Sequence, residues 1–135
     1  METDAVKLVK HSFDQCCARP EFFDDFYEIF FSSSAEIKKM FDDTDLDKHR
    51  VLLSAGISDL IMSYQGDPGS NARLTTIGTM HSREELNVRP FLYPLWVNSL
   101  IATIAKYDPD YSDKLKKAWV QVLGRGVKKV TDQFY

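Results

Sequence analysis

Two of the three histidines in the sequence continue the apolar stripes of predicted helices. His81 ends a stripe that contains Leu74, Ile77 and Gly78. His49 belongs to a second stripe, made of Leu46, Leu53, Ile57, Leu60 and Ile61. Side chains three and four residues apart share one face of a helix, so both imidazoles are predicted to point inward. A lone histidine on an apolar face is more often a core residue than a ligand, but two on separate helices indicate a common site.

Inward histidines can hold a metal ion, transfer protons or ligate a haem iron. A structural zinc site usually has four protein ligands and a catalytic zinc site three, whereas only two histidines point inward here. His11 lies off the apolar stripe of the first predicted helix, and Cys16 and Cys17 belong to a different segment from His49 and His81, so they do not complete a site. The sequence has no nucleophile motif and no glycine-rich phosphate loop. A haem needs only one histidine and apolar walls, because the porphyrin supplies the other nitrogens. Since there is no CxxCH motif, we expect haem b, held non-covalently.

Tyr27 is the polar member of an otherwise aromatic stripe. A helix over about residues 20–33 is predicted to turn Phe23, Phe26, Tyr27 and Phe30 inward. A phenol buried among phenylalanines needs a hydrogen-bond partner, and a ligand bound in a pocket would provide one.

Composition and charge restrict the class of protein. The chain has 135 residues, of which 44% are hydrophobic and 13% aromatic, so we expect one packed domain over residues 1–135. Its net charge is −3 without a dense basic cluster, which argues against a nucleic-acid partner. No apolar stretch has the length of a membrane span, and the adjacent cysteines are poorly placed to pair with each other. We therefore expect a soluble, cytoplasmic protein.

Helical periodicity runs through the whole sequence, so the predicted fold is all-α with about six to seven helices. Gly66, Pro68 and Gly69 predict a loop over residues 65–71. Thr44 and Asp47 have the spacing of a capping box and predict the start of the helix that carries His49. The expected helices are 3–18, about 20–33, a short one reaching Phe41, one ending near Tyr64, one ending near His81, about 90–107, and a last one containing Trp119.

Several segments together resemble the globin family, specifically the bacterial single-domain globins and the haem domains of flavohaemoglobins. The segments are "FYEIFFSSSAEIKKMF", "TDLDKHRVLL", "LTTIGTMHSREELNVRPFLYPLW" and "KLKKAWVQVLG". The resemblance covers about residues 5–130. It implies a globin fold in which the helices surround a haem pocket.

The resemblance also implies roles for individual residues. His81 is similar to the proximal histidine that ligates iron, and His49 and Tyr27 resemble the distal residues. Phe41 matches the phenylalanine that wedges against the porphyrin, and Arg83 is placed to reach a propionate. The remaining candidate haem-binding residues are Leu53, Ile57, Ile77, Val88 and Tyr93.

The chain departs from these relatives in two places. Many bacterial globins have glutamine where His49 stands. Flavohaemoglobins pair a proximal tyrosine with a glutamate late in the last helix, whereas this sequence reads "VTDQFY" there. No reductase domain is present, which argues against self-sufficient nitric oxide dioxygenase activity.

The resemblance implies reversible binding of a diatomic gas, with oxygen expected and nitric oxide or carbon monoxide as other ligands, at a pentacoordinate or reversibly hexacoordinate iron. Two alternatives stay open. One is a haem enzyme, either a peroxidase or a nitric oxide dioxygenase served by a partner reductase. The other is a haem-free, globin-like signalling module. The sequence leaves the oligomeric state open.

The segment "DKHRVLL" permits two registers for the distal residue. Lys48 would share a face with Asp59, an acid expected at the surface, whereas His49 shares one with apolar residues only. Burial therefore favours His49.

Overall fold

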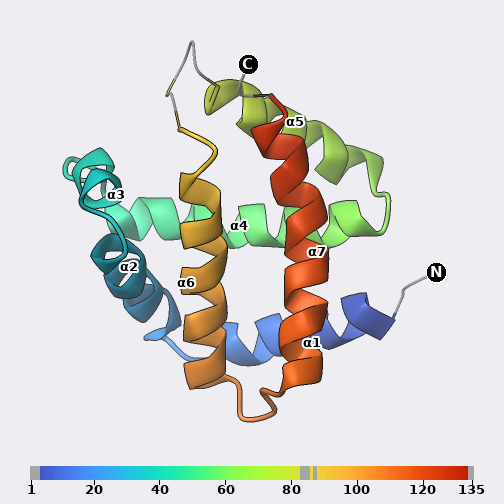
Figure 1. Ribbon diagram of the computed structural model, residues 1–135. Coiled ribbons are helices and arrows are strands. Elements are labelled where there is room, and N and C mark those ends of the chain that lie inside the picture. Colours follow the sequence, from blue (N-terminus) through green and yellow to red (C-terminus); the bar gives the residue numbers. More distant parts are fainter. Residues whose placement is uncertain (1–3, 83–85, 87, 134–135) are drawn as a thin grey trace.

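The computed structural model describes residues 4–82, 86 and 88–133, and within them it has seven α-helices and no strand. This confirms the all-α prediction. The helices in chain order are α1 (Asp4–Cys17), α2 (Phe22–Ser32), α3 (Ala35–Met40), α4 (Leu46–Tyr64), α5 (Pro68–Met80), α6 (Leu92–Tyr107) and α7 (Asp113–Thr131) (Figure 1). None of these helices is long and apolar enough to cross a membrane.

Helices α6 and α7 run antiparallel, side by side, and cross in front of α1 and α4 in Figure 1. Helix α5 packs on α4 and α7, and α2 packs on α3 and α6. All seven helices contribute to one apolar core, whose fully buried members include Val6, Phe26, Ile37, Ile57, Leu74, Leu100 and Trp119. Each such side chain stabilises the fold by about 1.5–3 kcal/mol through its removal from water.

Side-chain caps fix the starts of α4 and α5, the helices on which the two inward histidines are predicted. Asp45, not the predicted Thr44, caps α4 and accepts hydrogen bonds from the backbone N–H groups of Asp47 and Lys48. The Asp67 carboxylate accepts from the backbone N–H of Ser70 at 2.8 Å and caps α5. The loop predicted over 65–71 is therefore shorter, because Pro68 suits the first turn of a helix. Gly66 makes the preceding turn with a φ of 89°.

Asp59 is buried, so the expectation that it lies at the surface is wrong. Its carboxylate accepts from Arg73 Nε at 3.0 Å and from Ser70 Oγ at 3.1 Å. Burial of an acid is tolerated when it is paired and hydrogen-bonded. The network joins α4 to α5, the helices on which the two inward histidines are predicted.

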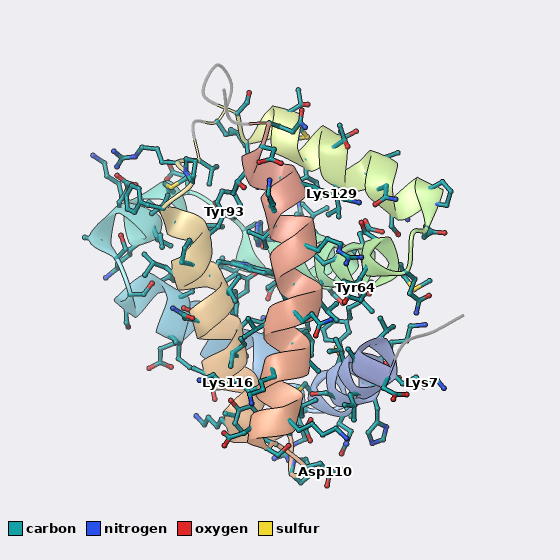
Figure 2. All side chains as sticks on the ribbon, turned by 45° about the vertical axis from the view of Figure 1, so that its right-hand side comes forward. Lys7, Tyr64, Tyr93, Asp110, Lys116 and Lys129 are labelled. Atoms are coloured by element: carbon teal, nitrogen blue, oxygen red, sulfur yellow. The ribbon has the colours of Figure 1, made fainter. Side chains whose placement is uncertain are left out.

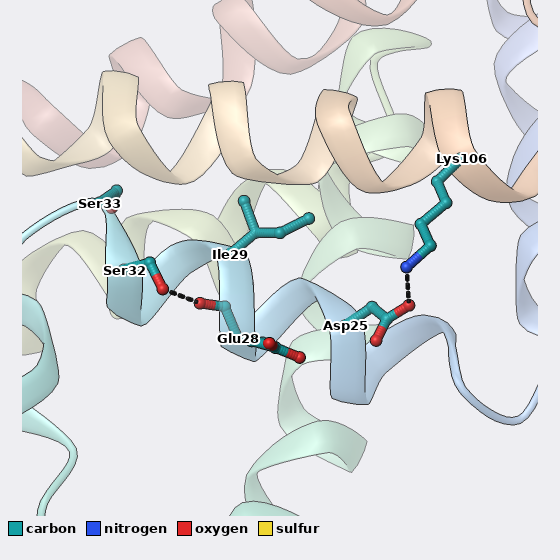
Figure 3. Close-up of a pocket in the computed structure, with 6 residues that line it drawn as sticks. All are labelled: Asp25, Glu28, Ile29, Ser32, Ser33 and Lys106. Atoms are coloured by element: carbon teal, nitrogen blue, oxygen red, sulfur yellow. Dashed lines mark hydrogen bonds and ion pairs between the residues drawn. The ribbon is translucent and has the colours of Figure 1, made fainter.

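Helix α2 differs slightly from its prediction. Phe22 is fully buried, whereas Phe23 is only half-buried. The helix is also tied to α6, because Asp25 forms an ion pair with Lys106 at 2.7 Å and accepts a hydrogen bond from Tyr107. Asp25 and Lys106 line an open pocket between the two helices together with Glu28, Ile29, Ser32 and Ser33 (Figure 3).

Gly78 lets the last turn of α5 approach α7 closely. A Cβ atom at this position would lie 2.6 Å from Gln133 Cγ and 2.9 Å from the carbonyl oxygen of Val130. The carbonyl belongs to the backbone, so it has little freedom to move away. The contact sets the position of the turn that leads to His81.

We expect Gly78→Ala to lower the free energy of unfolding by about 1–3 kcal/mol, as overpacking in a core does. Gly124→Ala is the matched control, since Gly124 is exposed within α7 and an added Cβ meets nothing within 4 Å. That variant should be stabilised by about 0.5–1 kcal/mol, because glycine is unfavourable inside a helix. Urea denaturation measures both. Equal stability of the two variants would contradict the close approach.

Candidate functional site

His81 lies where α5 ends, as the C-cap residue of the helix. Its backbone N–H donates to the carbonyl oxygen of Ile77 at 2.9 Å, which fixes its backbone. Its half-buried ring places Nδ1 2.9 Å from the hydroxyl oxygen of Tyr93. Tyr93 stands on the first turn of α6 (Figure 2). The end of α5 and the start of α6 therefore orient this imidazole together.

His49 lies on the first turn of α4. Its Nδ1 is 2.7 Å from the hydroxyl oxygen of Tyr27 on α2. The imidazole also packs edge-on against Phe41, with ring centroids 5.1 Å apart. Phe31 joins the same group, because its ring lies 5.6 Å from that of Tyr27 and 5.3 Å from that of Phe41.

The two histidines thus share one arrangement, in which Nδ1 of each ring is paired with a phenol. Neither Nε2 atom makes a hydrogen bond within the described chain, and neither is among its buried polar atoms without a partner. Both Nε2 atoms are therefore accessible to a bound group. Such nitrogens can ligate a metal ion or donate a hydrogen bond, depending on the tautomer.

Burial sets the protonation of the four residues. It lowers the pKa of His49, and it lowers the pKa of His81 with a smaller contribution from the charge of His49. Burial also raises the pKa of Tyr27 and of Tyr93 to about 12, although the charge of Arg50 opposes the shift at Tyr27. At neutral pH the site therefore holds two neutral imidazoles and two protonated phenols.

The structure gathers Tyr27, Phe41 and His49 in one group, and His81 and Tyr93 in another. The two groups are related electrostatically, because the charge of His49 contributes to the lowered pKa of His81. Among the other candidate residues, the buried core includes Leu53 and Ile57, while Ile77 and Val88 pack against it. Arg83 lies outside the described residues. Lys48 and Leu52 are exposed, so the inward side of the first turns of α4 carries His49.

Two residues near the site are absent from the sequence predictions. Phe31 follows Tyr27 by four residues, so helical spacing alone places it on the same face. Arg50, in contrast, has no sequence signal, because its partner Asp24 is 26 residues away.

The sequence matches the family model for globins over residues 24–130. It is also similar to a protein of Pseudomonas aeruginosa PAO1 whose crystal structure is described as structurally highly homologous to a human haemoglobin. The two chains are 37% identical with a TM-score of 0.94, and the match covers 97% of this chain and 98% of that one. No curated protein matches the sequence at a significant level. The chain belongs to the globin family, which implies a haem cofactor.

The lowered histidine pKa values predict a pH dependence of stability. The unfolded chain, with histidines at their usual value of 6.5, binds more protons than the folded one. The free energy of unfolding should therefore be greatest above pH 6.5 and fall as the pH decreases from there. Urea denaturation of the haem-free protein as a function of pH measures this. A variant with both His49→Gln and His81→Gln should lose most of the decline, and a decline that persists would assign it to other groups.

Proposed function

We propose that this globin holds haem b non-covalently through His81 and reversibly binds a diatomic ligand, with oxygen as the expected one. One observation supports this above the others: His81 has one nitrogen tied to Tyr93, and its other nitrogen has no hydrogen-bond partner among the described residues. A histidine that ligates a metal usually donates its second ring N–H to a fixed acceptor, which sets the tautomer. When the Tyr93 hydroxyl oxygen accepts from Nδ1–H of His81, the lone pair of Nε2 is available.

The residues present fit a haem. His81 supplies a neutral imidazole nitrogen, and the partly buried side chains of Ile77 and Val88, which pack against the core, supply apolar surface. Haem, when bound, would supply an iron atom that takes up one diatomic molecule. The remaining work belongs to side chains on the distal side.

Tyr27 and His49 supply the polar groups of the distal side. Because the pKa of Tyr27 is raised to about 12, its phenol stays protonated at neutral pH. The pair shares one hydrogen bond at 2.7 Å, so when the phenol donates to Nδ1, the imidazole carries its proton on Nε2. His49 can then donate to a ligand with partial negative charge. A hydrogen bond of this kind contributes about 1 kcal/mol or more and slows release.

Tyr93 favours reversible binding over peroxidase chemistry. A carboxylate on the proximal imidazole would draw its proton and increase electron donation, whereas a neutral phenol accepts without doing so. The pKa of Tyr93 is raised to about 12, so the phenol is uncharged at neutral pH. Strong electron donation from the proximal side is what assists O–O cleavage. His81 in this arrangement suits a carrier.

Replacing His81 tests the proximal assignment. His81→Ala should abolish stable haem retention, or leave haem whose binding is restored by added imidazole, because the variant lacks the proximal imidazole nitrogen. His11→Ala is the matched control, since His11 is exposed on α1 and contacts Gln15. Absorption spectra of the ferric, ferrous and carbonmonoxy forms measure retention. An unchanged ferrous spectrum in His81→Ala would overturn the assignment.

Replacing His49 tests the distal assignment. His49→Leu should speed oxygen release about tenfold, since one lost hydrogen bond of about 1.4 kcal/mol corresponds to that factor. It should also speed autoxidation and remove any six-coordinate, low-spin signal of the unliganded protein. Lys48→Ala, at the exposed neighbouring position, should leave all three nearly unchanged. Stopped-flow kinetics and absorption spectra measure the effects, and the reverse pattern would place the distal residue at position 48.

A further inference from the structure

We propose that Arg50 is a positioning residue, which pairs with Asp24 to fix the first turns of α4 against α2 and thereby hold His49 on Tyr27. Its consequence for ligand binding rests on the proposed function. The positioning itself concerns only the chain's own residues.

The ion pair of Arg50 with Asp24 and the hydrogen bond of His49 with Tyr27 both join α4 to α2. Arg50 Nη2 lies 2.6 Å from Asp24 Oδ1, and His49 Nδ1 lies 2.7 Å from the hydroxyl oxygen of Tyr27. Asp24 precedes Tyr27 by three residues, so both face the same side of α2. Arg50 directly follows His49 in α4. A movement of the first turns of α4 away from α2 would therefore break the ion pair and displace His49 together.

The first turns of α4 have little else to hold them. Between Ile37 and Leu53 none of the side chains is buried. Val51 and Leu52 are 67% and 69% exposed, so they do not anchor the helix by burial. Helix α4 packs on α5 and α7, and its buried residues begin at Leu53. His49 is therefore held by the two polar ties, by its contact with Phe41, and by the partial burial of Leu46 against the core.

The Arg50 side chain is inserted beside the site instead of extending into water. It is 32% exposed, and its Nε atom is buried and has no hydrogen-bond partner in the described part of the chain. Its charge also acts on Tyr27, where it opposes the effect of burial on the pKa. Asp24, in contrast, is 62% exposed, and a pair of this kind adds little to overall stability. The expected effect of breaking it is local.

Loss of the tie should leave α4 capped by Asp45 but free to move in its first turns. His49 would then leave the Tyr27 hydroxyl more often, and its Nε2 would be freer to reach a bound haem. In the haem-loaded protein this should raise the six-coordinate, low-spin fraction. Arg50 thus limits the movement of His49.

The test compares two variants that break the tie with two that do not. Asp24→Asn and Arg50→Gln remove it. Asp47→Asn removes only the contact of Arg50 within α4, at 3.3 Å, and Asp25→Asn removes the neighbouring tie of α2 to Lys106. Arg50→Lys retains the positive charge and should restore much of the original behaviour.

Hydrogen exchange of the backbone amides of residues 49–52, on the protein as purified, is the first measurement. Exchange should increase several-fold in Asp24→Asn and Arg50→Gln and stay unchanged in Asp47→Asn and Asp25→Asn. The low-spin fraction, from absorption spectra of the unliganded haem-loaded protein, should rise in the same two variants only. Equal exchange in all four variants would overturn the positioning role, whatever the spectra show. Failure of the unaltered protein to bind haem would overturn the proposed function and leave the exchange result to decide on Arg50.

Discussion

A neutral imidazole inside an apolar fold needs a hydrogen-bond partner for one ring nitrogen, and both inward histidines meet this need with a phenol. The phenol fixes the orientation of each ring and leaves its second nitrogen for a bound group. Since the four residues come from α2, α4, the end of α5 and α6, the relative placement of these helices decides whether the site exists. The core and the polar contacts of the chain hold that placement.

Each histidine depends on contacts outside its own pair. The close approach of Gly78 to α7 sets the position of the last turn of α5, which leads to His81. The ion pair between Asp59 and Arg73 holds α5 on α4. On the other side, consecutive acids of α2 point to different helices, Asp24 to α4 and Asp25 to α6. The helix that carries Tyr27 is thus tied on two sides. These contacts explain how small side chains and exposed charges influence a site that they do not touch.

Much of this arrangement could be predicted from the sequence, because helical periodicity alone places His49, His81 and Tyr27 on inward faces. Helix boundaries were less accurate where a cap competed with loop-forming residues, as at Asp67 and Pro68. Asp59 was misplaced because its partner lies in the next helix, and spacing within one helix cannot reveal such a pair. Spacing within one helix also cannot reveal the roles of Tyr93 and Arg50, because each contacts a residue outside its own helix. Tyr93 was a candidate site residue only through the family resemblance, and Arg50 was not predicted. Tertiary pairing, rather than periodicity, determines them.

The central claim is that the imidazole of His81 binds a haem through its Nε2 atom. Titration of the haem-free protein with haemin tests this claim most directly. We expect saturation at one haem per chain and, after reduction and addition of carbon monoxide, the absorption spectrum of a histidine-ligated haem. Absence of saturable uptake, or a carbonmonoxy spectrum without a histidine ligand, would contradict it.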